Sequence, residues 1–119
     1  QNPNDLAILF RDYDDQVREY TFGDLSRLSN RFANVLIAHG LKREDRVGIL
    51  LPQAPETAVS NIAAYKAALI AVPLFILFGE EALEYRLASC GARAVVTDST
   101  GLPKILAIRD QLPELRVIF

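Results

Sequence analysis

The sequence has few of the residues that build metal and disulfide sites: its 119 residues include one cysteine, one histidine and no methionine or tryptophan. Cys90 cannot form a disulfide within the chain, which is typical of a protein from a reducing compartment. Cys90 and His39 supply too few ligands for a zinc site, so we expect no metal centre. We interpret Cys90 as a small packing residue and His39 as a helix-end residue. Because the chain contains no methionine, we expect its natural start to lie before Gln1.

Glycine is also sparse, and its spacing argues against a phosphate-binding loop. Such a loop needs glycines close together, so that backbone N–H groups can approach the phosphate oxygens. The six glycines are Gly23, Gly40, Gly48, Gly79, Gly91 and Gly101. Since neither a Walker loop nor a dinucleotide fingerprint is present, we expect no self-contained nucleotide site.

The chain has no strong charge imbalance and no long hydrophobic run. Its formal net charge of −2 gives no electrostatic reason to expect nucleic acid or an anionic membrane as a partner. The longest uncharged apolar run, residues 67–79, is shorter than the ~20 residues that span a bilayer. Residues 1–5 lack the basic start and apolar core of a signal peptide. We therefore expect a cytoplasmic protein without a membrane span.

What is present is the composition of a globular domain, with 50% hydrophobic and 24% charged residues. Two apolar segments flank the polar residues 13–16, which predicts a β-hairpin over residues 6–20. Thr21 is a good N-cap, and Asp24 three positions later completes a capping box. Apolar residues then recur at three- and four-residue steps up to His39, which predicts an amphipathic helix. They are Phe22, Leu25, Leu28, Phe32 and Leu36.

From Arg46 onward, strand and helix patterns alternate. The predicted strands are residues 46–52, 70–75, 94–97 and 115–119, and the predicted helices begin at Pro55, Glu80 and near Ser99. Pro73 restricts where the second of these strands can sit or pair. Such alternation predicts βαβ crossovers and a parallel sheet. The fold class that we expect is α/β, with parallel-sheet layers, flanking helices and an N-terminal β-hairpin.

The acidic and aromatic side chains form no pattern typical of a catalytic site. Adjacent carboxylates fall in predicted turns or helix starts, where solvated acids are ordinary, so we predict no catalytic residue among them. These pairs are Asp14-Asp15, Glu44-Asp45 and Glu80-Glu81. We expect Asp45 and Arg46 to organise the start of a strand through backbone hydrogen bonds. Tyr65 and Tyr85, each on a predicted helix, are interpreted as core or interface residues.

Four segments, taken in order, resemble the adenylate-forming enzymes, the superfamily of acyl-CoA synthetases, luciferases and the adenylation domains of peptide synthetases. They are residues 20–25 (YTFGDL), 40–52 (GLKREDRVGILLP), 64–74 (AYKAALIAVPL) and 78–98 (FGEEALEYRL, then GARAVVTD). Each segment consists mostly of structural residues, but together they cover most of residues 20–98 in register. The version FGEEALEYRL is most similar to acetyl-CoA and short- to medium-chain acyl-CoA synthetases.

The resemblance implies an activity that residues 1–119 do not perform alone. Such enzymes react a carboxylic acid with ATP and Mg²⁺ to give an acyl-adenylate and pyrophosphate, then transfer the acyl group to the thiol of CoA. Their phosphate-binding loop, adenine-binding motif, hinge and adenylating lysine come later in the chain, so we expect the catalytic residues beyond Phe119. Residues 1–119 are then an incomplete part of the N-terminal AMP-binding domain (hairpin 6–20, α/β region 21–119). This part is expected to be a scaffold that is inactive alone and binds none of these ligands tightly.

Three departures from the family pattern modify what the resemblance implies. Ala68 replaces a common glycine, so we expect a tighter or more helical passage from helix to strand there. Glu44 stands where glycine is usual before Asp45-Arg46, which alters the turn. In the acetyl-CoA synthetase branch, Phe-Gly-Gly follows the second strand near the CoA nucleotide, and only Phe75 matches it here. Phe75 is therefore the one candidate binding residue, on the CoA side.

Two interpretations from other classes stay open. One is a free-standing α/β binding module, such as a flavodoxin-like domain, whose ligands lie beyond the carboxyl ends of the strands. A receiver-type module needs an acidic cluster at a strand end, whereas Asp14-Asp15 falls in the predicted hairpin. The other is an interaction module whose exposed sheet edge pairs with another chain. We also expect the isolated chain to expose apolar surface and to self-associate.

Overall fold

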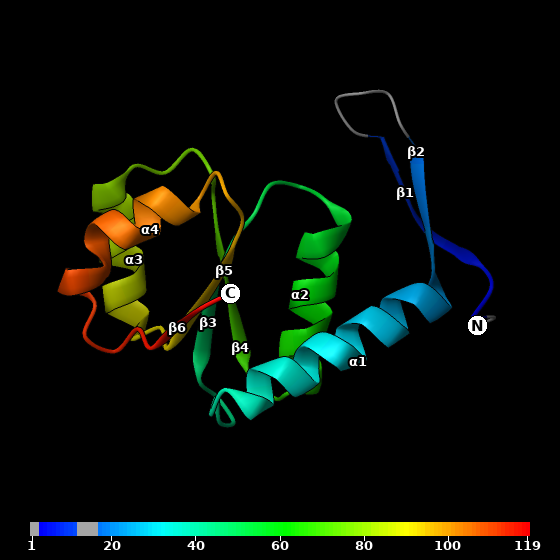
Figure 1. The fold of residues 1–119 in the computed structure, drawn as a ribbon, viewed down its shortest axis with the longest axis horizontal. Coiled ribbons are helices and arrows are strands. Elements are labelled where there is room, and N and C mark those ends of the chain that lie inside the picture. The colour runs from blue at the N-terminus through cyan, green and yellow to red at the C-terminus, as the bar shows by residue number, and fades with distance from the viewer. Residues whose placement is uncertain (1–2, 12–16) are drawn as a thin grey trace.

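The computed structural model of this chain describes residues 3–11 and 17–119, and its strands and helices follow the predicted order (Figure 1). The elements are β1 (Leu6–Arg11), β2 (Val17–Thr21), α1 (Phe22–Ala38), β3 (Arg46–Leu50), α2 (Pro55–Lys66), β4 (Ile70–Leu74), α3 (Glu80–Cys90), β5 (Ala94–Thr97), α4 (Leu102–Ile108), the 3₁₀ helix η1 (Arg109–Gln111) and β6 (Val117–Ile118). An antiparallel hairpin, β1–β2, stands apart from a four-stranded parallel sheet. The expected α/β fold class is confirmed. The predicted hairpin turn, with Asp14-Asp15, lies outside the described residues.

The parallel sheet has the strand order β4-β3-β5-β6. Gly48 in β3 pairs with Val72 of β4 on one side and with Val95 of β5 on the other. Pro73 belongs to β4, an edge strand of this sheet, where its missing N–H breaks no ladder. The expectation that Pro73 limits where its strand can pair is confirmed, because β4 pairs on one side only within this sheet.

Strand β6 is shorter than predicted, because only Val117–Ile118 have regular strand geometry. The backbone ladder nevertheless continues to the next residue. The Phe119 N–H donates to the Val95 carbonyl at 2.9 Å, and the Thr97 N–H donates to the Phe119 carbonyl at 3.0 Å. The predicted strand 115–119 is therefore confirmed in its second half.

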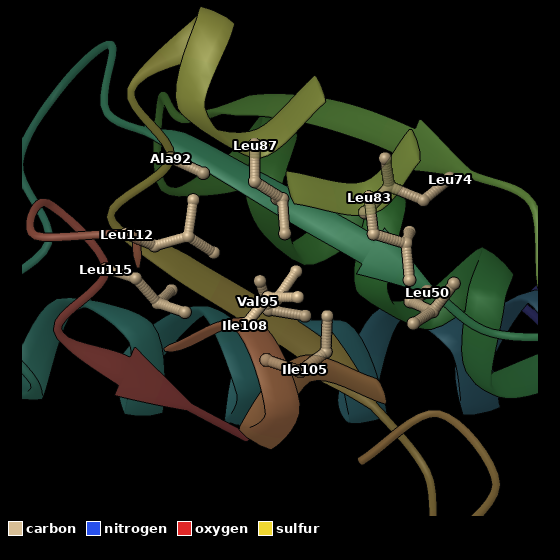
Figure 2. Packing of buried hydrophobic residues seen from close by; sticks show 10 residues of the cluster. All are labelled: Leu50, Leu74, Leu83, Leu87, Ala92, Val95, Ile105, Ile108, Leu112 and Leu115. Atoms are coloured by element: carbon tan, nitrogen blue, oxygen red, sulfur yellow. The ribbon is translucent and has the colours of Figure 1, made fainter. Parts of the chain in front are cut away.

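Side chains of the central strands alternate between two cores, one on each face of the sheet. In β5, Val95 faces the core made with α3 and α4, whereas Ala94 and Val96 face the core made with α1 and α2. The first core, drawn in Figure 2, contains Leu50, Leu74, Leu83, Leu87, Ala92, Val95, Ile105, Ile108, Leu112 and Leu115. The second contains Ala33, Leu36, Leu41, Val47, Ala63, Ala64, Leu69, Ala94 and Val96. The sheet is thus covered on both faces, as parallel sheets require.

Helix α1 begins at the predicted capping box. The Asp24 N–H donates to Thr21 Oγ1 at 3.0 Å, and the Thr21 N–H donates to Asp24 Oδ2 at 2.9 Å. The bond from the Thr21 N–H, with the Arg27 guanidinium 2.6 Å away, lowers the pKa of Asp24. The ionised carboxylate therefore stabilises the fold above its ordinary pKa, and this contribution is lost as the pH falls through the lowered pKa.

Helices α1 and α2 are joined by small residues and one lysine. Ala63 and Ala64 are fully buried, which agrees with the close packing expected of an alanine-rich helix. Lys66 Nζ donates to Ser29 Oγ and to Asn30 Oδ1 of α1, both at 2.8 Å. Because Ser29 is fully buried, Lys66 supplies a hydrogen bond to a hydroxyl that water does not reach.

Ala68 and Glu44, at the two positions where the resemblance leads us to expect glycine, adopt a left-handed backbone, with φ 60° and φ 70°. Ala68 does not make the passage from helix to strand more helical, because α2 ends at Lys66. Instead, the Leu69 N–H donates back to the Ala64 carbonyl at 2.8 Å, the pattern of a helix end that normally uses glycine. Ala68 therefore has the left-handed backbone conformation that glycine usually adopts at such a helix end.

Tyr65 and Tyr85 lie on the surface, so the interpretation of either as a core residue is wrong. They are 84% and 73% exposed. The buried faces of their helices are filled by other residues, Ala64 in α2 and Leu83 in α3 among them. Within residues 3–11 and 17–119, no helix is long and apolar enough to cross a membrane.

Candidate functional site

The carboxyl ends of β3, β4 and β5 lie together at one end of the sheet, which we call its carboxyl edge. Parallel sheets commonly bind ligands there. The ends of β3 and β5 are tied together, since Thr97 Oγ1 donates to the Leu50 carbonyl at 2.9 Å. Asp98, which follows β5, accepts the N–H groups of Thr100 and Gly101, both at 3.0 Å. The Asp98 carboxylate therefore orders the turn that leads into α4.

The loop after β4 presents Phe75, the residue predicted to contact a ligand. Phe75 is 71% exposed, and its ring meets the ring of Phe78 edge-on with centroids 5.2 Å apart. The Phe78 N–H donates to the Phe75 carbonyl at 3.0 Å, which closes a turn. The Arg86 guanidinium carbon lies 4.6 Å from the centroid of the Phe78 ring. Phe75 is thus exposed, but its ring is oriented by Phe78, which itself packs under the Arg86 guanidinium.

A hollow of about 440 Å³ adjoins Phe75 at the carboxyl edge of β3 and β4. It is bounded by the loop after β3, by α2 and by β4. Its lining residues are Ile49, Leu51, Pro52, Gln53, Thr57, Asn61, Pro73, Leu74, Phe75 and Ile76. Asn61 and Gln53 are exposed amides beside an exposed aromatic ring. A flat heteroaromatic group can find both stacking and hydrogen bonds in such a place.

A larger groove of about 640 Å³ lies between α1, α2 and the end of β5. Most of its lining is apolar, with Phe32, Val59, Val96 and Phe119 among the contributing residues. Phe119 packs edge-on against Phe32, with ring centroids 5.6 Å apart, and against His39, with centroids 5.0 Å apart. The groove offers apolar contact rather than an assembled catalytic group.

His39 and Cys90 have the structural places predicted for them. His39 is the C-cap of α1, and its Nδ1 lies 2.8 Å from the Val35 carbonyl oxygen. Cys90 ends α3 and packs against the core made with α3 and α4. Neither residue lines the hollow beside Phe75 or the larger groove.

The predicted role of Asp45 and Arg46 at the start of β3 is confirmed. Asp45 Oδ2 accepts the Lys42 N–H at 2.8 Å, and the Asp45 carbonyl accepts the Ile70 N–H at 2.9 Å. The Arg46 carbonyl accepts the Arg93 N–H at 2.9 Å. These bonds join the starts of β3, β4 and β5, at the opposite end of the sheet from Phe75.

Three of the acidic residues expected to be solvated are exposed in the structure. Glu80 and Glu81 are exposed in the first turn of α3, and Glu44 is exposed in a turn. Across residues 3–11 and 17–119, no three histidine, cysteine, aspartate or glutamate side chains come together as a metal site.

The whole chain, residues 1–119, matches the family described as AMP-binding enzyme. The chain belongs to this family. The acetyl-coenzyme A synthetase of Bacillus subtilis (strain 168) is 37% identical to it over 117 residues, which are 98% of the chain and 20% of the relative. That of Phycomyces blakesleeanus is 38% identical over 102 residues, 85% of the chain and 15% of the relative. The resemblance found in the sequence is confirmed.

A solved structure agrees with this assignment to the AMP-binding family. The crystal structure of Brucella canis acyl-CoA synthetase superposes with a TM-score of 0.88 at 33% identity, covering 99% of this chain and 22% of the other. Across these relatives the chain spans between 15% and 22% of their length. Residues 1–119 therefore correspond to a small part of each of these relatives.

Lys104, in the first turn of α4, contacts the loop after β4, and the sequence pattern does not predict this contact. Its Nζ donates to the carbonyl oxygens of Ile76 at 2.6 Å and of Phe78 at 3.2 Å. A lysine in the first turn of a helix is unfavourable, because that end of the helix is partially positive. This local misfit is the signal in the sequence that could have drawn attention to Lys104.

Proposed function

We propose that the chain is the N-terminal part of an AMP-forming carboxylate–CoA ligase. The longer protein converts a short- to medium-chain carboxylic acid to an acyl-adenylate with ATP and Mg²⁺, then to an acyl-CoA, in fatty-acid metabolism. The observation that supports this most directly is the family match over all 119 residues. The named relatives, acetyl- and acyl-CoA synthetases, agree with it.

Within that enzyme, we propose that residues 1–119 serve as scaffold and form an incomplete part of the AMP-binding domain. Two cores on opposite faces of one sheet fix the relative positions of the loops at its carboxyl edge. No residue of this chain is assigned to ATP or Mg²⁺, and the chain alone is expected to be inactive. We place the enzyme in the cytoplasm, in keeping with the single cysteine.

Phe75 is proposed to contact CoA. Its ring is 71% exposed at the carboxyl end of a parallel strand and borders the hollow of about 440 Å³. Exposed aromatic rings stack on nucleobases with little dependence on the base, each contact contributing about 1–3 kcal/mol. ATP and CoA both carry an adenine, and the adenine of CoA is the one proposed because the family resemblance places the position of Phe75 near the CoA nucleotide.

The proposed activity is tested by ATP–pyrophosphate exchange across carboxylic acids from acetate to long-chain fatty acids. The complete gene product is expected to catalyse exchange with at least one acid, and the 119-residue chain with none. Thioester formation with CoA then identifies the acceptor. A complete product that is inactive with every acid would instead favour a binding or interaction module.

The isolated 119-residue chain is also proposed to self-associate, with a second copy as the occupant of the apolar groove. The groove between α1 and α2 leaves Val35 39% exposed beside other apolar side chains. Contiguous apolar surface of this kind tends to find a partner. Analytical ultracentrifugation is expected to give a mass above 13.2 kDa that grows with concentration. A strictly monomeric chain at high concentration would contradict this.

A further inference from the structure

The loop between β4 and α3 is held by a residue from a distant element. Lys104 lies in the first turn of α4, and its half-buried side chain reaches across to the loop. One ammonium group donates to two loop carbonyls, those of Ile76 at 2.6 Å and Phe78 at 3.2 Å. An ammonium group has three donors and carbonyl oxygens are acceptors, so one cation satisfies both acceptors. Lys104 therefore fixes the loop at two points.

The position of Phe75 depends on these two points. Phe78 packs against the core, lies under the Arg86 guanidinium and is held through its carbonyl by Lys104. Phe78 in turn orients Phe75, through the ring contact at 5.2 Å and the turn hydrogen bond of 3.0 Å. Without the lysine, the loop backbone would lose its charged tether while the core beneath it stayed intact.

We propose that Lys104 is a positioning residue for CoA binding: it holds the loop so that the exposed Phe75 ring faces the hollow in the orientation that stacks on the CoA adenine. The inference rests on the proposed function, because the CoA contact of Phe75 is part of it. It adds a role for a residue that touches no substrate and acts through the backbone of residues 76 and 78. Such a residue affects the step that uses CoA and spares the step that does not.

The complete gene product with Lys104→Met is the first test, because methionine keeps the length and packing of the side chain but removes its donors. The KM for CoA is expected to rise about tenfold, the loss of one well-placed stacking contact. ATP–pyrophosphate exchange, which needs no CoA, is expected to stay within about twofold of the unchanged protein. Lys104→Arg retains charged donors and is expected to restore most of the affinity for CoA.

Lys42→Met is the matched control, because Lys42 is exposed in the turn before β3, at the opposite end of the sheet. This variant is expected to leave both the exchange rate and the KM for CoA unchanged. A Lys104→Met protein whose KM for CoA is unchanged, or whose exchange falls as much as its thioester formation, overturns the positioning role while leaving the proposed function intact. Absence of exchange in the unchanged protein with every acid overturns the proposed function, and the CoA role with it.

A readout independent of activity follows the loop itself. Hydrogen–deuterium exchange of the amides of residues 76–79 is expected to speed up in Lys104→Met and not in Lys42→Met, with exchange in the β3 and β5 peptides unchanged. Equal protection of the loop in both variants would show that Lys104 does not hold it and would overturn the inference. General loss of protection across the sheet would show a structural role instead and would also overturn it.

Discussion

Replacing Leu83 with alanine is expected to lower the free energy of unfolding by about 2–5 kcal/mol, the range for a leucine removed from a packed core. Leu83 is fully buried on α3 and belongs to the core that joins α3 and α4 to the sheet. Figure 2 shows it in the same layer as Leu50 and Leu74. The shortened side chain loses its contacts and leaves a cavity that the strands beneath cannot close without shifting.

Leu77→Ala provides a control with the same chemical change six positions earlier. Leu77 is 92% exposed in the loop before α3, so this substitution is expected to change the free energy of unfolding by no more than about 0.5 kcal/mol. Urea unfolding of both variants, followed by circular dichroism, gives the comparison. Similar losses in the two proteins would mean that the core in Figure 2 is not what holds α3 to the sheet.

Ala68→Gly is expected to raise the free energy of unfolding by about 0.5–1 kcal/mol, because relief of the ~1–2 kcal/mol left-handed penalty outweighs the ~0.5–1 kcal/mol that glycine costs through its greater freedom in the unfolded chain. Ala68 has φ 60°, and its conformation is enforced on both sides. The Leu69 N–H donates back to α2 at the Ala64 carbonyl, while the Ala68 carbonyl accepts the Glu44 N–H at 2.8 Å. Because Glu44 also has a positive φ of 70°, two strained turns support one another at this end of the sheet.

The neighbouring substitution Ala67→Gly separates relief of strain from any general effect of glycine. Ala67 has φ −85°, which suits alanine, so glycine there is expected to lower the free energy of unfolding by about 0.5–1 kcal/mol through its greater freedom in the unfolded chain. Thermal and urea unfolding of the two variants should therefore shift in opposite directions. Destabilisation by Ala68→Gly would mean that the Ala68 methyl group contributes packing that outweighs the strain.

Local chemistry made much of this fold predictable. The capping box joins Thr21 and Asp24, which are only three positions apart in the sequence, and the structure contains it. The apolar strands and their alternation with helices predicted the parallel sheet, and Pro73 indicated a strand with restricted pairing. Such features depend on residues close together in sequence or on the period of a single element. These local features are present in the folded chain because tertiary packing stabilises them.

Features set by tertiary contacts were predicted less well. The sequence of α2 does not specify which of its faces is turned inward; in the structure that face carries Ala63 and Ala64, and Tyr65 is 84% exposed. The positive φ of Ala68 could be foreseen only from the family's glycine, since alanine itself favours a right-handed backbone.

The candidate site was predicted as one residue, Phe75, and by resemblance rather than by local pattern. Its hollow combines the loop after β3, α2 and β4, and no single segment contains enough of it to be recognised. Lys104 lies 28 residues beyond Ile76, so their contact exists only once α4 packs beside α3. Contacts of this kind depend on the order of the strands in the sheet. The periodicity of a single strand does not specify that order.

On the ribosome, each strand of the β4-β3-β5-β6 sheet after β3 emerges when its partner has already been made. β4 pairs with β3, β5 pairs with the other side of β3, and β6 pairs with β5, so each arriving strand meets one that has already been made. The sheet can therefore assemble outward from β3 as the chain emerges. Both hydrogen-bonding edges of β3 are covered once β5 has been synthesised, which shortens the time during which an unpaired apolar strand could recruit another nascent chain.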